Sequence, residues 1–200
     1  MVKLEEAFYQ RNDVVRIAKD LLGKVLFTNI NGNVAGGIIV ETEAYSYKEK
    51  GCHAYNSRMT ERNEVMFKCG GHAYVYLCYG IHHLFNVVTN VEGKADAVLI
   101  RALEPIAGMP YILQRMKSKS IKRITSGPGK LTKALGIDRS LNADYLLGDS
   151  VWIEDQGINV SKNSIVASPR IGIDYAGEDA GLLWRFTIKG SEWVSKNGNR

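Results

Sequence analysis

The alternation of apolar and polar positions along the chain predicts a mostly antiparallel β protein. Residues 24–45 read as strand, Asn-Gly turn and strand, which is the pattern of a β-hairpin. Residues 72–90 predict a second pair of strands around a glycine turn, and residues 95–105 predict a further strand that ends in charge and proline. The last fifty residues return to strands and turns, so antiparallel β structure prevails in the prediction.

Helical patterns are fewer and shorter. Apolar residues recur at helical spacing over residues 14–26, which predicts an amphipathic helix. Residues 109–123 predict a second helix, rich in basic side chains. Residues 125–137 predict a Gly/Pro turn that leads into a short helix, with Thr125 or Ser126 as its N-terminal cap. The pattern as a whole predicts a mixed α+β fold.

Composition places the chain among ordinary globular proteins. It has 200 residues, of which 45% are hydrophobic and 24% charged, and it shows no internal repeat or linker. We therefore expect a single domain, residues 1–200, with its own core. Three cysteines indicate reduced thiols rather than a secreted disulfide framework. We expect neither a signal peptide nor a membrane span, because no apolar run is long enough.

The net charge of +5 is small, but the basic residues are clustered. No acidic residue lies between Glu104 and Asp138, a segment that holds seven cations: Arg115, Lys117, Lys119, Lys122, Arg123, Lys130 and Lys133. A block of one sign is the usual footprint of a polyanionic partner. The alternative is an ordinary solvated helix face.

The segment "IIVETEAY" raises a question of chemistry. In a strand, Glu41, Glu43 and Tyr45 share one face because side chains alternate. A carboxylate beside an aromatic ring can serve as a general base under a planar ligand. The alternative is an edge strand with a solvated polar face.

The segment "YVYLCYG" carries three tyrosines. Tyr74 and Tyr76 share one strand face, while Tyr79 falls on the other or in the turn before Gly80. Closely spaced tyrosines suit a stacking platform for nucleic-acid bases. Aromatic packing in the core is the alternative, since tyrosine favours strands in any case.

A metal site is disfavoured. Cys69, His72, Cys78 and His82 are the residue types that zinc prefers, but the predicted strand between them would pull the two pairs apart. The glycine-rich "SGPGK" matches neither phosphate-binding fingerprint, although its backbone amides could still cradle a phosphate.

Taken together and in order, these segments resemble the alkyladenine (3-methyladenine) DNA glycosylase family. The resemblance covers nearly the whole chain and rests on "AKDLLGK", "VETEAY", "CHAY", "TERNEVMF", "YVYLCYGIHHLFNVV", "VLIRALEP", "SGPGKLTKALGI", "PRIGIDYAG" and "LWRF". It implies a curved antiparallel, open-barrel-like sheet decorated by helices. It also implies base excision repair of DNA damage, in which a damaged purine is flipped out and its N-glycosidic bond hydrolysed.

The resemblance implies the catalytic groups. Glu43, the second acid of the motif, would activate a water for attack on the sugar C1′. Arg101 would lie near that water, and the main-chain carbonyl of Ile171 would be its second contact. No lysine occupies the Glu43 motif, so the reaction is expected to be monofunctional and to leave an abasic site.

The resemblance also implies the DNA-binding groups. Tyr45 and Tyr76 would sandwich the flipped base, with His53 closing the pocket beside them. Asn86 would crowd the exocyclic amino group of normal guanine. Tyr79 would intercalate as the wedge that fills the gap in the stack, and an inserted side chain offsets part of the flipping cost.

Partners and place follow from the same resemblance. Double-stranded DNA holding damaged purines is the expected partner. The basic block described above, rather than the resemblance, predicts that Lys117, Lys119, Lys122, Arg123 and Lys130 bind its phosphates. We expect a monomer without cofactor or metal, in the bacterial cytoplasm with the nucleoid. The residues 50–52 depart from the family pattern, which commonly has an acid followed by small residues there.

Two other classes compete with the enzyme. A non-catalytic nucleic-acid-binding module could use the same fold, which resembles the barrel-like RNA-binding domain of methionyl-tRNA formyltransferase. Such a binder has no need of the Glu43–Arg101 pair. A zinc protein is the third possibility. A zinc content well below one equivalent in the purified chain would exclude it.

Overall fold

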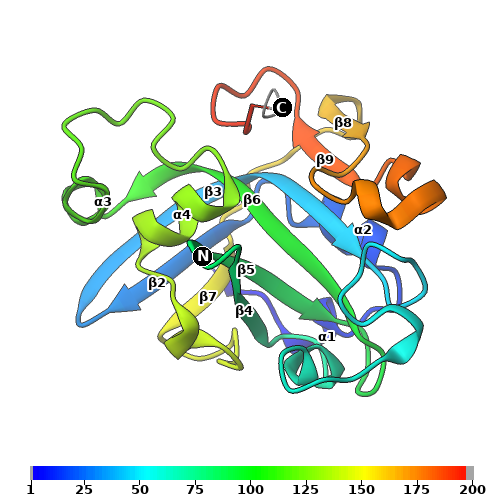
Figure 1. The fold of residues 1–200 in the computed structure, drawn as a ribbon. Helices are drawn as coiled ribbons and strands as arrows, with labels where there is room; N and C mark the ends of the chain where they lie inside the picture. Colours follow the sequence, from blue (N-terminus) through cyan, green and yellow to red (C-terminus); the bar gives the residue numbers. More distant parts are fainter. Residues whose placement is uncertain (1, 197–200) are drawn as a thin grey trace.

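One curled antiparallel sheet organises the computed structural model, which describes residues 2–196 (Figure 1). The order of its main path is β1-β7-β2-β3-β6-β5-β4, and β9 adds to β3 while β8 pairs with β9. The strands are β1 (Val2–Lys3), β2 (Val25–Ile30), β3 (Asn33–Tyr45), β4 (Ala73–Cys78), β5 (His82–Thr89), β6 (Asp96–Ala107), β7 (Val151–Asp155), β8 (Ile165–Ser168) and β9 (Arg185–Ile188). The predicted fold class, a half-barrel sheet with helices around it, is confirmed.

Four helices of the described residues 2–196 lie around this sheet. They are α1 (Glu6–Tyr9), α2 (Val14–Asp20), α3 (Met109–Met116) and α4 (Pro128–Leu135). Short 3₁₀ turns complete the described chain: η1 (Tyr55–Ser57), η2 (Glu64–Phe67), η3 (Arg139–Leu141), η4 (Lys162–Ser164) and η5 (Asp174–Gly181). No helix of the described residues is long and apolar enough to cross a membrane.

The long strand β3 is the centre of the sheet. Along one edge it pairs with β6, and along the other it pairs first with β2 and then, over Glu41–Glu43, with β9. The predicted hairpin of β2 and β3 is confirmed, and its Asn31-Gly32 turn has the two positive φ angles, 53° and 80°, of a type I′ turn. The alternative that "VETEAY" is an edge strand is wrong, because β3 has neighbours on both sides.

The two faces of β3 have different surroundings. Thr42 turns toward α2, where its hydroxyl donates to the carbonyl of Ala18 at 2.8 Å. Apolar residues from α2, β3, β5, β6 and β9 fill the main core, among them fully buried Ile17, Ile39 and Phe85. A smaller apolar cluster joins buried residues of the loop 52–67 to Tyr74 and to residues of β5 and β6. Glu41 and Glu43 therefore point away from α2, as strand parity predicts.

Three predicted boundaries were wrong. The helix predicted over 109–123 ends at Met116, because Lys117 takes a left-handed conformation (φ 50°) and closes the last turn with its amide. The helix predicted to end near Gly23 ends at Asp20, and a turn leads into β2. Strand β6 continues past its proline to Ala107, still paired with β3.

The predicted cap of α4 was also wrong. Gly127 occupies the N-cap position without a side-chain hydrogen bond. The hydroxyl of Thr125 donates to the Leu103 carbonyl at 2.6 Å, and that of Ser126 donates to the Trp193 carbonyl at 2.6 Å. These two side chains tie the loop before α4 to β6 and to the C-terminal segment instead.

Candidate active site

A cavity of about 860 Å³ opens between the β4–β5 hairpin, the loop after β3, the start of α4 and residues 171–175. We call it the tyrosine pocket. Most of the predicted site residues line it: Tyr45, His53, Tyr76, Tyr79, Asn86, Arg101, Lys130 and Ile171. Its charged lining consists of Arg62, Arg101 and Lys130, with no carboxylate from the described chain. The folding of distant segments thus brings the predicted residues together beside a basic wall.

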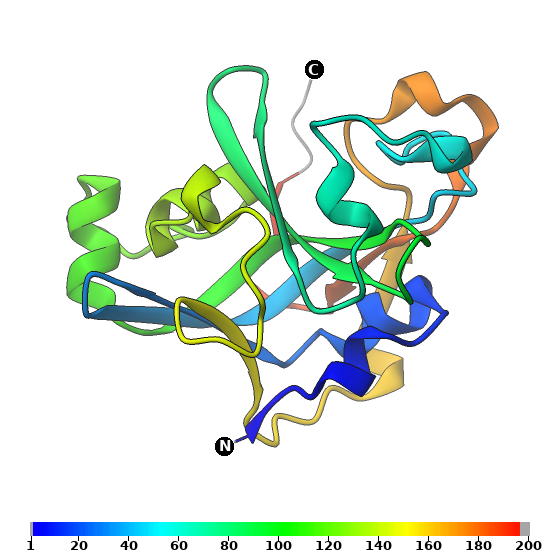
Figure 2. The same ribbon diagram turned by 90° about the horizontal axis from the view of Figure 1, so that it is seen from below.

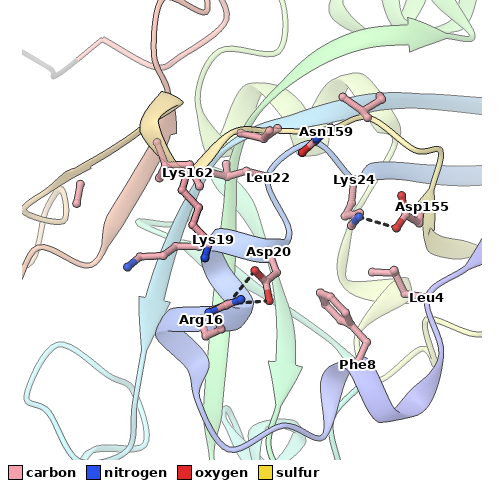
Figure 3. Close-up of a pocket in the computed structure, with 14 residues that line it drawn as sticks. Leu4, Phe8, Arg16, Lys19, Asp20, Leu22, Lys24, Asp155, Asn159 and Lys162 are labelled. Carbon is pink, nitrogen blue, oxygen red and sulfur yellow. Dashed lines mark hydrogen bonds and ion pairs between the residues drawn. The ribbon is translucent and has the colours of Figure 1, made fainter.

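A second cavity, of about 620 Å³, lies between α2 and the chain that follows β7 (Figure 3). Two ion pairs sit on its rim, Arg16 with Asp20 at 3.1 Å and Lys24 with Asp155 at 2.6 Å. None of the predicted site residues lines it. The tyrosine pocket is therefore the candidate active site.

Glu43 lies directly behind the wall of the tyrosine pocket and is fully buried. Its Oε2 accepts hydrogen bonds from the Tyr45 hydroxyl at 2.8 Å and from Arg101 Nη1 at 3.1 Å. Its Oε1 accepts one from the amide of Ile171 at 2.8 Å. A carboxylate has about four acceptor positions, so Oε1 keeps one for a further donor. All three of its partners line the pocket.

Glu41 has the same strand face but a different environment. It accepts hydrogen bonds from Arg101 Nε at 2.9 Å, Arg185 Nε at 2.7 Å, and the amide and hydroxyl of Ser195 at 2.7 and 2.8 Å. Burial alone would raise the pKa of Glu41, but the two guanidinium groups and the Ser195 amide outweigh it and lower the pKa below its ordinary value. Glu41 thus accepts four hydrogen bonds, one more than Glu43, and lines neither of the two cavities, which makes it a structural carboxylate.

A pair of β-bulges sets the position of Arg101. In the register of β3 and β6, Ile39 faces Leu103 and Glu41 faces Ala102, but Thr42 faces Ile100, so Arg101 has no partner across the ladder. A bulge re-aims the side chain that it carries. Here Arg101 reaches both carboxylates, where a regular ladder would place it opposite Glu41 alone.

Tyr45 and Tyr76 approach the pocket from different strands. Tyr45 continues the Glu43 face of β3, and its pKa is raised well above the ordinary value by burial and by the neighbouring carboxylate. Tyr76 stacks on Tyr74 at 5.3 Å between ring centroids, and His53 meets Tyr76 edge-on at 4.7 Å. Tyr74 is buried in the smaller apolar cluster, as the alternative of core packing expects, and Tyr76 lines the pocket.

His53 is held as a neutral ring. Its Nδ1 lies 2.9 Å from the Tyr74 hydroxyl, and its own carbonyl accepts from the Asn63 side chain at 2.8 Å. The residue keeps an exposed part at the pocket, but desolvation of the ring by the surrounding protein, followed by the positive charge of Arg62, lowers the pKa of His53 to about 4. At neutral pH it can therefore accept or donate a hydrogen bond without adding charge to the pocket.

Asn86 and Tyr79 occupy opposite ends of the hairpin. Asn86 is buried in the pocket wall, where its amide donates to the Tyr74 carbonyl at 3.1 Å. Tyr79 stands at the tip, 84% exposed, with a positive φ of 49° followed by Gly80 at 69°. Only a tight turn holds a tyrosine in that conformation, and the tip projects away from the sheet (Figure 2).

The basic block is spread over different places. Lys130, at the start of α4, lines the tyrosine pocket. Lys117, Lys119 and Lys122 are exposed on the segment between α3 and α4. Arg123 is engaged elsewhere, because its guanidinium donates to two carbonyls of the C-terminal segment at 2.8 and 2.6 Å.

The unusual residues 50–52 are built into the pocket margin. The amide of Gly51 donates to Glu49 at 2.7 Å, and that of Lys50 donates to the Asp179 side chain at 2.9 Å. Cys52 is buried, and burial raises the pKa of its thiol to about 12. This thiol is therefore a core group and no nucleophile.

The residues first considered for zinc have other contacts. His72 Nδ1 lies 2.9 Å from the Cys69 carbonyl, and Cys78 pairs with His82 across the hairpin. Over residues 2–196, no group of three histidine, cysteine, aspartate or glutamate side chains is placed to hold a metal ion.

Four residues around the pocket were missed in the sequence. Arg62 and Tyr175 line it, and the buried pair Glu49 and Arg170 supports it. Arg62 lies in the motif "TERNEVMF", and Arg170 and Tyr175 lie in "PRIGIDYAG", so the sequence could have indicated these three residues. Their contacts depend on long-range folding, and the sequence could not predict them.

Known proteins of one family are similar to this chain over nearly its whole length. The family model described as "Methylpurine-DNA glycosylase (MPG)" matches residues 7–192. A protein of Natranaerobius thermophilus, named "Putative 3-methyladenine DNA glycosylase", is 45% identical over 98% of this chain and 100% of its own length. Proteins of the same name from Carboxydothermus hydrogenoformans and Clostridium acetobutylicum are 48% and 45% identical, over 96% and 97% of this chain and 98% of each relative. The chain belongs to the methylpurine-DNA glycosylase family.

Proposed function

We propose that this chain is a monofunctional DNA glycosylase that flips damaged purines out of duplex DNA and hydrolyses their N-glycosidic bond. The observation that carries the proposal is the buried Glu43 carboxylate. Three donors from the pocket wall fix its orientation, and one acceptor position on Oε1 remains for a water. A binding module needs no such preoriented carboxylate.

Glu43 is the general base of this reaction. A water donates to its free position and attacks the sugar C1′, while the bond from C1′ to the purine nitrogen breaks. The proton of the water passes to Glu43, and the base leaves with the bonding electrons. Arg101 holds the carboxylate through Nη1, and the Ile171 amide holds its other oxygen.

The tyrosines receive the flipped base. A base cannot be hydrolysed inside the stack, so it must be extruded at a cost of a few kcal/mol. Tyr45 and Tyr76 line the pocket and offer π-faces to a purine. Asn86, fixed by its hydrogen bond to the Tyr74 carbonyl, rejects the exocyclic amino group of guanine by a steric clash.

Tyr79 breaks the stack. Its exposed ring stands at the tip of the hairpin whose base carries Tyr76 and Asn86. One rigid element thus joins the wedge to the pocket, so insertion and extrusion occur together. Lys117, Lys119, Lys122 and Lys130 bind DNA phosphates. The enzyme acts as a monomer in the bacterial cytoplasm, where the nucleoid offers its substrate.

The test is base release from duplex oligonucleotides that each hold one defined lesion, such as 3-methyladenine, 7-methylguanine or hypoxanthine. We expect a free base and an intact strand that breaks only on alkali treatment. Strand cleavage without alkali would contradict monofunctional hydrolysis and would point to Lys130 as an amine nucleophile. Lesion binding without release of any base would favour the binding module.

A further inference from the structure

We propose that the buried pair of Arg170 and Glu49 is a positioning clamp that holds Tyr45 and the Ile171 amide in place around Glu43. The inference rests on the proposed function, since it concerns the same reaction. Neither residue touches the catalytic carboxylate; both act through the groups that do.

The clamp is a bidentate ion pair. Arg170 Nη1 lies 2.6 Å from Glu49 Oε1, and Nη2 lies 2.7 Å from Glu49 Oε2. The two side chains are 0% and 4% exposed. Such a paired fork fixes direction as well as distance.

The same guanidinium reaches strand β3 beside the catalytic carboxylate. Its Nη1 also donates to the carbonyl of Ala44 at 2.9 Å, the residue between Glu43 and Tyr45. Its central carbon lies 4.8 Å from the centre of the Tyr45 ring. Arg170 thereby fixes the backbone and the ring of the residue that donates to Glu43 Oε2.

Arg170 also fixes the segment that supplies the other donor. Ile171 is the next residue along the chain, and its amide reaches Glu43 Oε1 at 2.8 Å. Nη2 of Arg170 donates to the Asp179 carbonyl at 3.1 Å, and the Asp179 side chain accepts from the Lys50 amide. One guanidinium therefore joins the end of β3, the loop of Glu49 and the segment 170–181.

Residues 50–52, whose sequence departs from the family pattern, pack against the clamp. A Cβ on Gly51 would lie 2.9 Å from Glu49 Oε2 and 3.3 Å from Arg170 Nη2. A side chain at this position would force the Glu49 carboxylate to shift from its place in the ion pair. Glycine here therefore fits the clamp.

Stability alone does not account for the pair. Well-packed apolar side chains of similar volume often replace a buried ion pair without loss of stability. What they cannot replace is the pair of directed hydrogen bonds from Arg170 to the carbonyls of Ala44 and Asp179, which hold the chain on both sides of Glu43. The double variant Glu49→Leu/Arg170→Met separates the two roles, because it leaves no unpaired buried charge.

The test compares wild type, this double variant and Arg170→Lys, which keeps the charge but lacks the fork. The matched control removes the Lys24–Asp155 pair on the rim of the second cavity. Three quantities are measured: unfolding temperature, affinity for duplex DNA with an uncleavable abasic analogue, and single-turnover release of hypoxanthine. A fourth, hydrogen exchange of the Ile171 amide in the free protein, needs no activity.

We expect the clamp variants to keep DNA affinity, to lose base release by about 100-fold, as a misplaced catalytic group does, and to exchange the Ile171 amide faster. The control variant should match wild type in all four measured quantities. A folded clamp variant with wild-type release and wild-type amide protection would overturn the inference. If wild type releases no base, the proposed function fails, and amide protection alone then decides whether the clamp positions Ile171. If the double variant unfolds, Arg170→Lys decides by the same two readouts.

Discussion

At the scale of single residues, Glu41 and Glu43 show how surroundings divide two identical side chains. They lie two positions apart on one strand and share Arg101. Glu41 accepts four hydrogen bonds from Arg101, Arg185 and Ser195, whereas Glu43 accepts three, all from residues that line the pocket. Strand parity predicted their common face and the neighbouring Tyr45. It could not predict which carboxylate is structural, because that depends on strand β9 and on the C-terminal segment.

We predict that Glu41→Gln destabilises the protein. The change leaves two buried guanidinium groups short of a counter-charge, and breaking such a pair typically costs about 3–5 kcal/mol. Chemical denaturation of the variant and of wild type measures the difference in unfolding free energy. An unchanged free energy of unfolding would show that Glu41 has no structural role.

His53 provides a prediction on pH. Its pKa is lowered to about 4 in the folded protein, against about 6.5 in an unfolded chain. The neutral ring therefore favours the folded state at pH above 6.5, and this contribution is lost as the pH falls toward 4.

An NMR titration of the His53 ring measures this directly, with a midpoint near pH 4 expected. Arg62→Met should raise the midpoint, because the guanidinium contributes to the lowered pKa, and Arg62→Lys should leave it nearly unchanged. A wild-type midpoint at or above pH 6.5 would contradict the structure of the pocket.

At the scale of elements, the β4–β5 hairpin carries both ends of the proposed flipping step. Its strands hold Tyr76 and Asn86 in the pocket wall, and its tip holds Tyr79 in a turn with positive φ. The predicted strand pair and glycine turn were correct, since they follow from local patterning. The predicted C-terminal end of α3 was wrong, because Lys117 takes a left-handed conformation. The predicted cap of α4 was wrong, because Thr125 and Ser126 bind β6 and the C-terminal segment instead.

We predict that Tyr79→Ala lowers excision from duplex DNA more than from single strands. A wedge matters only where a base stack must be opened. The measurement compares single-turnover rates on the same hypoxanthine lesion in both forms of DNA. Equal losses on the two substrates would mean that Tyr79 has no wedge function.

At the scale of the whole molecule, the curled sheet gathers distant segments at one end. The hairpin tip projects on one side, while α1 and α2 lie at the opposite end (Figure 2). The sequence predicted the strands and the residues of the pocket, since motif order reflects the family. It could not predict the bulge at Arg101 or the Arg170–Glu49 pair, which arise from contacts between segments more than fifty residues apart.

The distribution of charge belongs to the same scale. We predict that the double variant Lys117→Gln/Lys119→Gln binds DNA more weakly and with a smaller salt dependence. Each lost phosphate contact lowers the slope of log affinity against log salt concentration by about one. Affinity measured across a salt series gives the slope. Lys24→Gln, on the rim of the second cavity, is the control and should behave as wild type; an unchanged slope in the double variant would remove these lysines from the DNA interface.

The central claim is that Glu43 activates the water, and Glu43→Gln tests it most directly. Glutamine keeps the volume and can still hydrogen-bond a water, but it cannot take the proton. We predict that the variant binds lesion-containing duplex DNA with wild-type affinity while base release falls by about 10²–10⁴-fold. Release of hypoxanthine at the wild-type rate by folded Glu43→Gln would contradict the account.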